Sequence, residues 1–225
     1  MTTDDPHRDC KLQYASAPLE SAKLVVLAAH GRYGSAGDIL RVADQVDAQD
    51  VAWIAPDAVR GSWLAASFLA PLARNEPGLS SALARFLAVL DDLSGMGIGP
   101  ERIVLTGFSQ GACLILELAA RRPCPWHGIV AMSGGLIGSA DTDEAPRDTL
   151  NGHVPKRFDY DGNLSSVPIH MGAHAEDPLI PIARVRHSAD VLRKMGAKVT
   201  VDVSPGKMHG ILQNDVSTLQ KLLLT

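Results

Sequence analysis

Short runs of consecutive apolar residues recur along the chain, and segments of helical length lie between them. The runs have the length of strands that are buried on both faces, because such strands show no polar alternation. We predict strands at residues 24–29, 51–55, 102–106, 128–132, 167–171 and 199–203, and helices at residues 35–46, 80–93, 112–120, 182–195 and 209–224.

Strands that alternate with helices in this way predict an α/β fold, with a mostly parallel central sheet and helices on both of its faces. Residues 11–15 alternate between apolar and polar positions and predict a short edge strand. No break in composition divides the chain, so we expect a single domain over residues 1–225, with residues 1–10 as a loose tail. Residues 138–165 are polar and rich in Asp, Pro and Gly, and predict a long loop.

Composition narrows the choice of partners and compartment. The formal net charge of −4, without a basic stripe, argues against a nucleic-acid partner. No apolar run has the length of a membrane span, and the polar N-terminus lacks the apolar segment of a signal peptide. Three widely spaced cysteines fit a reducing compartment. We therefore expect a cytoplasmic protein without a nucleic-acid partner or a membrane span, and we leave a homodimer open.

The stretch Gly107-Phe108-Ser109-Gln110-Gly111 lies between a predicted strand and a predicted helix. This is the context of the G-x-S-x-G turn, which raises a nucleophilic serine above a sheet. Glycine suits the positions two before and two after the serine, because a Cβ there would clash within the strained turn. The pattern therefore indicates Ser109 as a nucleophile.

A serine hydroxyl needs a base to take its proton, and the base needs an acid that fixes its tautomer. In this type of fold the acid and the histidine follow the serine, on loops after later strands. Asp177 follows the strand predicted at residues 167–171, and His209 follows the strand predicted at residues 199–203. Both are expected at the same sheet edge as Ser109, so we predict a triad of Ser109, His209 and Asp177.

Each partner of the serine has an alternative reading. Glu176 is adjacent to Asp177 and is a rival for the acid, whereas Asp159 and Asp161 are weaker rivals because they precede a strand. Asp177 alternatively caps the helix that follows it. His209 alternatively is a surface histidine in a glycine-containing loop.

The turn His30-Gly31-Arg32 follows the first long strand. We expect the backbone N–H groups of Arg32 and Gln110 to form an oxyanion hole, although an ordinary strand-to-helix turn would also explain the segment. The Arg32 side chain either points to solvent or binds an anionic group of the substrate through paired hydrogen bonds.

The apolar segment around Trp63, Leu64 and Phe68 lacks clean periodicity. These residues either form the wall of an acyl pocket or belong to the core. A metal site is not expected, because residues 159–170 lack the final Glu of a calcium loop, and His170 and His174 lie on a strand and its exit. No phosphate loop or dinucleotide fingerprint is present, so we expect no cofactor.

At these positions the chain resembles the phospholipase/carboxylesterase family of α/β-hydrolases, which includes the acyl-protein thioesterases. The resemblance runs from about residue 24 to the C-terminus. Residues 107–112 match the elbow of the family, His30-Gly31 its oxyanion turn, Asp177-Pro178 its acid loop, and Gly206 with His209 its histidine loop. Residues 63–77 resemble the bacterial carboxylesterase branch more than the thioesterase branch.

The chain departs from the family pattern at two positions. Members often have Leu-Gly after His-Gly, where this chain has Arg32-Tyr33-Gly34. Many members have His after the Asp-Pro pair, where this chain has Leu179. Because a side chain of different size and charge stands beside the expected oxyanion hole, the resemblance does not fix the substrate.

The resemblance implies a serine carboxylester hydrolase that acts through an acyl-enzyme intermediate, without metal or cofactor, on a small or medium acyl ester. Lysophospholipase-like activity is compatible with it. An alternative is a thioesterase that acts on acyl-protein or acyl-CoA, since the same triad would serve it. Another alternative is a low-turnover ligand-binding protein on a hydrolase scaffold.

Overall fold

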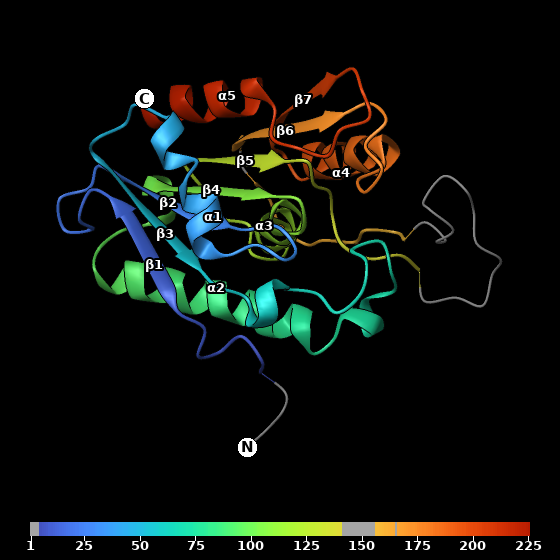
Figure 1. Ribbon diagram of the computed structural model, residues 1–225, viewed down its shortest axis with the longest axis horizontal. Coiled ribbons are helices and arrows are strands. Elements are labelled where there is room, and N and C mark those ends of the chain that lie inside the picture. Colours follow the sequence, from blue (N-terminus) through green and yellow to red (C-terminus); the bar gives the residue numbers. More distant parts are fainter. Residues whose placement is uncertain (1–4, 141–155, 165) are drawn as a thin grey trace.

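The computed structural model describes residues 5–140, 156–164 and 166–225. Seven strands form one sheet in the order β1-β3-β2-β4-β5-β6-β7 (Figure 1). The strands are β1 (Leu12–Ser16), β2 (Leu24–Ala29), β3 (Val51–Pro56), β4 (Ile103–Phe108), β5 (Gly128–Met132), β6 (Pro168–His174) and β7 (Lys198–Ser204). Only β1 at one edge runs antiparallel to its neighbour. The predicted α/β fold with a mostly parallel sheet is confirmed.

In the described part of the chain, five α-helices cover the two faces of this sheet (Figure 1). They are α1 (Ala36–Leu40), α2 (Gly78–Gly95), α3 (Gln110–Arg121), α4 (Ile182–Lys194) and α5 (Gln213–Leu223). Short 3₁₀ turns lie between them at η1 (Ala43–Gln45), η2 (Val59–Gly61), η3 (Leu72–Asn75) and η4 (Pro100–Arg102). Apolar residues of α2, α3 and α4 pack in one core, and those of α1 and α5 pack in the other.

The packing of strand β2 on both of its faces explains why its sequence is apolar throughout. Val25 and Leu27 point into the core under α2 and α3, whereas Val26 and Ala28 point into the core under α1 and α5. All six residues of the strand are buried. Side chains on both faces of a strand alternate by a period of two, so burial on both faces leaves no place for a polar residue.

The parallel register brings five strand ends to one edge of the sheet. Ala29 lies opposite Gly107, Phe108 opposite Met132, and Met132 opposite Gly172. Strand β7 continues this edge beside β6. The segments that follow β2, β4, β5, β6 and β7 therefore meet on the same side of the molecule, where ligands bind in open α/β sheets.

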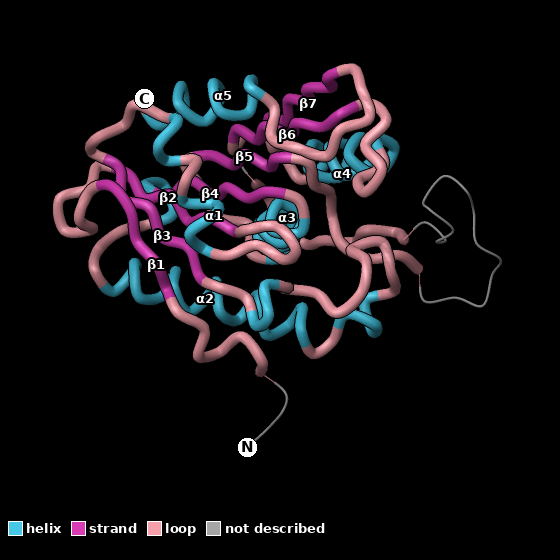
Figure 2. The backbone as a smooth tube through the Cα atoms, viewed as in Figure 1, coloured by secondary structure: helices cyan, strands magenta, loops and turns pink. Residues whose placement is uncertain are grey.

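The three largest differences from the expected element boundaries concern α1, β6 and α5, which are drawn among the other elements in Figure 2. The helix expected at residues 35–46 is broken into α1 and η1, because β-branched Val42 and the aspartates nearby favour helix poorly. Strand β6 continues to His174, since Gly172 packs against Asp215 rather than ending the strand. The last helix begins at Gln213, which leaves His209 in a loop.

The expectation of a loose tail is wrong for residues 5–10, and residues 1–4 lie outside the described residues. His7 is 2% exposed, and its ring bonds to backbone groups of Trp63 and Val59. These partners lie more than 50 residues away along the chain, which is why the local sequence did not indicate the anchor. Most of the loop expected at residues 138–165 likewise lies outside the described residues, and residues 156–164 contain no helix or strand.

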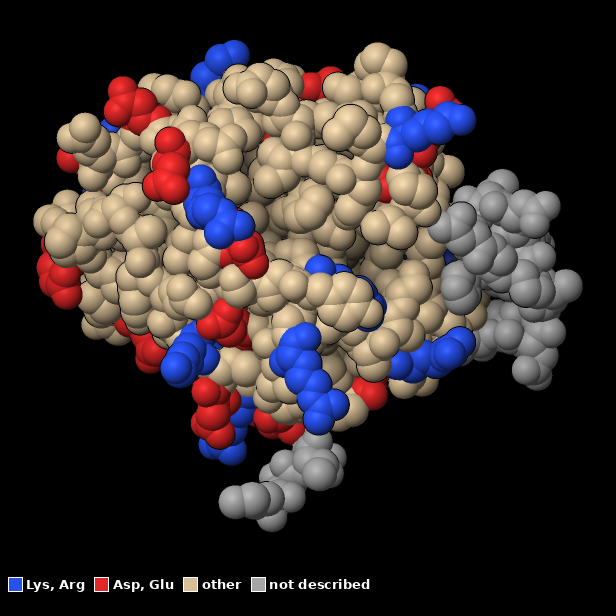
Figure 3. Space-filling model, in the orientation of Figure 1, with Lys and Arg blue, Asp and Glu red and all other residues tan. Residues whose placement is uncertain are grey.

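Charged side chains are interspersed on the face drawn in Figure 3, and neither sign forms a continuous field there. This distribution gives no basic track for a nucleic-acid backbone on that face. Within the described ranges, the helices are too short or too polar to span a bilayer.

Candidate active site

Ser109 lies at the sharp turn between β4 and α3, in a strained backbone conformation with φ 55° and ψ −120°. A Cβ on Gly111 would lie 2.1 Å from the carbonyl oxygen of Ala29, and one on Gly107 would lie 2.7 Å from the backbone of Gly111. Real Cβ atoms do not approach other atoms so closely, so both positions require glycine. The steric reason predicted for the two glycines is confirmed.

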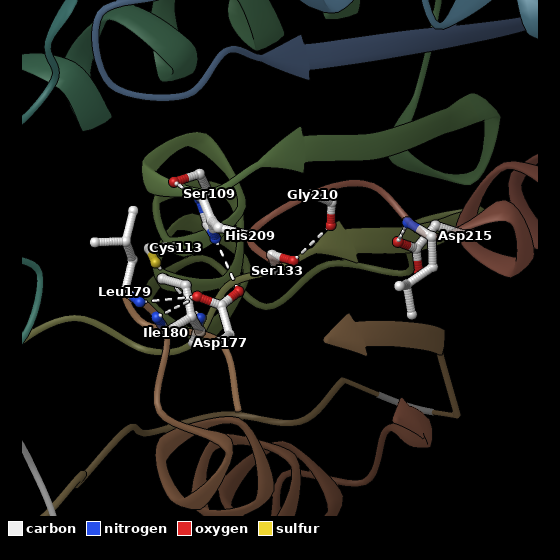
Figure 4. Close-up of polar contacts among 11 residues, drawn as sticks. Ser109, Cys113, Ser133, Asp177, Leu179, Ile180, His209, Gly210 and Asp215 are labelled. Atoms are coloured by element: carbon white, nitrogen blue, oxygen red, sulfur yellow. Dashed lines mark hydrogen bonds and ion pairs between the residues drawn. The ribbon is translucent and has the colours of Figure 1, made fainter. Parts of the chain in front are cut away.

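The structure brings Ser109, His209 and Asp177 together (Figure 4). The Oγ of Ser109 lies 2.8 Å from Nε2 of His209, and Nδ1 of His209 lies 2.8 Å from Oδ2 of Asp177. A carboxylate only accepts hydrogen bonds, so Nδ1 carries the proton and donates to Asp177. Nε2 is then free to accept the hydroxyl proton of Ser109, which is the arrangement of a serine nucleophile with its base.

Asp177 is buried and each of its carboxylate oxygens has partners. While Oδ2 accepts from His209, Oδ1 accepts from the backbone N–H groups of Leu179 and Ile180 (Figure 4). These bonds fix the carboxylate in one orientation. The capping alternative is wrong, because α4 begins at Ile182 with Pro181 as its N-cap, and Asp177 instead closes the turn before the helix while it holds His209.

Glu176, the adjacent rival acid, points elsewhere. Its carboxylate lies 3.5 Å from the ammonium of Lys207, and its side chain is 62% exposed. The weaker rivals are also unsuited to the role of the triad acid. Asp159 forms an ion pair with Arg157, and both side chains are largely exposed. Asp161 is also exposed.

The His209 loop is held at two points beyond the histidine itself. The hydroxyl of Ser133 donates to the carbonyl of Gly210 over 2.8 Å (Figure 4). Asp215 accepts from the backbone N–H of Leu212 and from Nε2 of His170. Both bonds to Asp215 are buried and shielded from competing water, whereas the bond from Ser133 to Gly210 is partly buried. Neither residue was indicated by the sequence pattern.

His30 is buried at the start of the oxyanion turn. Its Nε2 accepts from the backbone N–H of Ala58, so Nδ1 carries the proton and donates to the carbonyl of Gly31 over 2.7 Å. Burial lowers the pKa of His30. The neutral ring therefore braces the turn that carries Arg32.

Arg32 and Gln110 line the same pocket as Ser109. Neither backbone N–H has an acceptor among the residues that the structure describes. Gln110 is the first residue of α3, whose positive N-terminal end faces the serine. Within the described ranges, both N–H groups therefore remain without a backbone acceptor beside the pocket, and their role as oxyanion donors stays a prediction.

We call this cavity the Ser109 pocket; its volume is about 310 Å³. Its lining is Arg32, Ser67, Phe68, Ser109, Gln110, Leu179 and Ile180. Phe68 is therefore a pocket residue, as one alternative predicted. Leu179 and Ile180 were not predicted, although Leu179 stands where the family often has His.

Trp63 and Leu64 are core residues rather than pocket residues, which corrects that part of the expectation. They are 0% and 1% exposed. The indole N–H of Trp63 donates to the carbonyl of His30, and its backbone N–H donates to the side-chain oxygen of Gln110. The large ring is packed in the core against the oxyanion turn, so Trp63 supports the site without lining the pocket.

Two other groups near the site have structural surroundings. Burial raises the pKa of the Cys113 thiol to about 12, which keeps it protonated and unreactive. Nε2 of His170 is hydrogen-bonded to the carboxylate of Asp215. Across the described ranges, no three His, Cys, Asp or Glu side chains converge in a way that could hold a metal ion.

Comparison with known proteins connects this site to a family. The phospholipase/carboxylesterase family model matches residues 15–225. A phospholipase/carboxylesterase from Dyadobacter fermentans has the same fold with a TM-score of 0.85, at 32% identity, over 97% of this chain and 98% of that one. A carboxylesterase from Bacillus cereus shares the fold at 19% identity, with a TM-score of 0.70, over 96% of this chain and 93% of that one.

Curated relatives are similar over part of their length. Acyl-protein thioesterase 1 of Gibberella zeae is 29% identical over 154 residues, which are 68% of this chain and 60% of that protein. A putative esterase, NocK, of Nocardia uniformis is 27% identical over 186 residues, which are 79% of this chain and 53% of that protein. The chain thus spans between about half and three fifths of the relatives it matches.

Proposed function

The chain belongs to the phospholipase/carboxylesterase family, and from this we propose that it is a serine carboxylester hydrolase with Ser109 as nucleophile, His209 as general base and acid, and Asp177 as the orienting acid. The observation that carries the proposal is the pair of 2.8 Å hydrogen bonds that joins these three side chains. They come from segments that follow three different strands, so their convergence is not a local accident of sequence.

In the proposed reaction, the Oγ of Ser109 attacks the acyl carbon while Nε2 of His209 takes the hydroxyl proton. Asp177 stabilises the imidazolium that forms. The same Nε2 then gives its proton to the leaving oxygen as the C–O bond breaks, which leaves an acyl-serine. A water molecule, activated by His209, hydrolyses this intermediate and restores the free serine.

The negative charge that develops on the carbonyl oxygen needs donors already in position. The backbone N–H groups of Arg32 and Gln110 are the donors that we assign to this role. The buried ring of His30 holds the first of them through Gly31. Phe68, Leu179 and Ile180 give the Ser109 pocket an apolar wall, which suits a hydrocarbon acyl group.

A thioesterase that acts on acylated protein is the second candidate, favoured by the similarity to acyl-protein thioesterase 1. A thioester passes through the same tetrahedral intermediate, so the triad does not distinguish the two. The open Ser109 pocket and its modest volume fit a small or medium acyl group in either case. We place ester hydrolysis first because the family model and the similar structure from Dyadobacter fermentans are both described as phospholipase/carboxylesterase, and thioester hydrolysis second.

A fluorophosphonate probe tests the proposal directly, because it labels only serines with an activated hydroxyl. We expect rapid labelling of the wild type, loss of labelling in Ser109→Ala, and full labelling in Ser21→Ala, which changes an exposed serine far from the pocket. A series of p-nitrophenyl esters and matched thioesters of graded acyl length then ranks the two candidates. An unlabelled wild type would exclude both.

A further inference from the structure

Arg32 stands between two cavities. It lines the Ser109 pocket, and it also lines a second cavity that we call the Tyr33 pocket, of about 250 Å³. The residues of the Tyr33 pocket that matter below are Arg32, Tyr33, Asp38, Arg41, Phe108 and Ile211. Any substrate that occupies both pockets across Ser109 must pass beside the Arg32 side chain.

The guanidinium of Arg32 is held in place without being neutralised. Its Nη2 donates to the carbonyl of Ala66, and its Cζ lies 6.0 Å from the centre of the Tyr33 ring. Ala66 is itself held by the buried side chain of Asn75. In the ranges that the structure describes, no carboxylate lies within ion-pair distance of Arg32. The cation is thus oriented, half-buried and still able to donate hydrogen bonds.

The other cation of the Tyr33 pocket differs in this respect. The guanidinium of Arg41 donates to the carboxylate of Asp38, and its side chain is 70% exposed. Its charge is therefore already balanced and solvated. This contrast leaves Arg32 as the group in the pocket with an uncompensated charge.

The Tyr33 pocket adjoins the loop that carries His209, so an alcohol group seated in it would hold its leaving oxygen on the side of the proposed acid. Its Phe108 ring packs 5.0 Å from the His209 ring, and Ile211 follows His209 by two residues. The leaving oxygen must receive its proton from Nε2 of His209, so it faces this side. The acyl chain is then left to the apolar Ser109 pocket.

We propose that the Arg32 side chain binds an anionic group, a carboxylate or a phosphate, on the alcohol part of the ester. This inference rests on the ester hydrolysis proposed at Ser109 and adds the class of substrate. The fork of a guanidinium matches the paired oxygens of such groups. The preferred substrate is thus an ester with an apolar acyl chain and an acidic alcohol.

The test compares two acetyl esters of nearly equal shape, 4-acetoxybenzoate and 4-acetoxybenzamide, of which only the first is charged. The quantity measured is the ratio of kcat/KM for the charged ester to kcat/KM for the neutral ester. We expect Arg32→Gln, which keeps a donor for Ala66, to lower this ratio about 10- to 100-fold, the effect of one charge-assisted hydrogen bond. Arg32→Lys should retain part of the ratio because it keeps the charge.

Arg60→Gln is the matched control, because Arg60 is exposed, lies on η2 beside Tyr33 and has the same charge. Its ratio should stay close to that of the wild type. An equal loss on both esters in Arg32→Gln would mean that Arg32 only braces the loop at Ala66, and would overturn the inference. If a variant does not fold, the wild type still decides, since added NaCl should lower kcat/KM for the charged ester alone.

Failure of the subsite and failure of the proposed function give different results. A wild type that hydrolyses the neutral ester, with a ratio that depends on neither Arg32 nor salt, would remove the anionic subsite and leave the hydrolase proposal standing. A wild type that hydrolyses neither ester and takes no fluorophosphonate label would remove both.

Discussion

The hydroxyl of Ser133 donates a hydrogen bond to the carbonyl of Gly210, the residue next to His209. Ser133 follows β5 in a left-handed backbone conformation, with φ 54°, and is fully buried. The bond therefore joins the central part of the sheet to the loop that carries the proposed base. Its role is to position His209 rather than to contact substrate.

Replacing Ser133 tests this relationship. Ser133→Ala removes a partly buried hydrogen bond to the Gly210 carbonyl, which is worth about 0.5–1.5 kcal/mol. We expect kcat on p-nitrophenyl acetate to fall with little change in KM, since the substrate does not touch Ser133. Ser133→Gly accepts the positive φ more easily but also lacks the hydroxyl. A drop in kcat in both variants assigns the effect to the hydroxyl, whereas a drop in Ala alone would assign it to backbone strain.

Removing the nucleophile should abolish hydrolysis. Ser109→Ala is expected to lower turnover about 10⁴- to 10⁶-fold, because members of a triad act as a unit. The fold should survive, since alanine bears the same Cβ as serine at this strained position. Circular dichroism and thermal unfolding check the fold, and initial rates check the activity. Retention of a tenth of the activity by a folded variant would contradict the assignment.

The two adjacent carboxylates give opposite predictions. Asp177→Asn presents an amide to Nδ1 of His209, favours the wrong tautomer and should lower kcat by about 10⁴. Glu176→Gln removes an exposed charge that pairs with Lys207 and should leave kcat nearly unchanged. The pair is measured side by side on one ester. The reverse order of effects would assign the acid to Glu176.

Two buried histidines make stability depend on pH. Burial lowers the pKa of His7 and His30 from 6.5, because the charged ring loses its hydration in the interior. Between the lowered value and 6.5 the unfolded chain binds more protons, so stability rises with pH through this window. Their contribution is complete above pH 6.5 and is lost on acidification.

Urea unfolding below and above pH 6.5 measures this dependence. His7→Gln should flatten it, because an amide can accept from Val59 and donate to Trp63 without titrating. The matched control is His127→Gln, at a half-buried histidine, which should leave the pH dependence in place. Equal pH dependence in the wild type and in His7→Gln would exclude His7 as a source.

Activity should not require a metal ion. A triad and two backbone donors supply every proton transfer and charge contact of the proposed reaction. We expect prolonged dialysis against EDTA to leave kcat unchanged. Loss of activity that a divalent cation restores would point to a site involving His170 or His174.

Sequence patterns located the strands well because their signal is local. Residues 24–29 and 128–132 are strands with the predicted bounds, since an unbroken apolar run has few other places in a folded chain. The nucleophile turn was located for a similar reason, because its steric demand falls on Gly107 and Gly111 themselves. His209 and Asp177 could be placed only by counting from strand ends.

Long-range contacts escaped prediction for an equally physical reason. The burial of His7 depends on Trp63 and Ser81, and nothing in residues 5–10 indicates it. Ser133 and Asp215 are ordinary polar residues in the sequence, and only the fold aims them at the His209 loop. The same applies to Trp63, whose size suggested a pocket wall although it fills the core.

Strand β7 lies at the edge of the sheet, pairs with β6 along one side, packs against α4 and has no fully buried residue. Ser109 and His209 are 100 residues apart, so their bond forms only when this outer strand is docked. If β7 detached from the sheet edge, hydrolysis would stop while the helices still gave a native circular dichroism signal. Catalytic activity therefore reports whether β7 is docked. On heating, activity should disappear before the global unfolding transition, and on refolding it should return last.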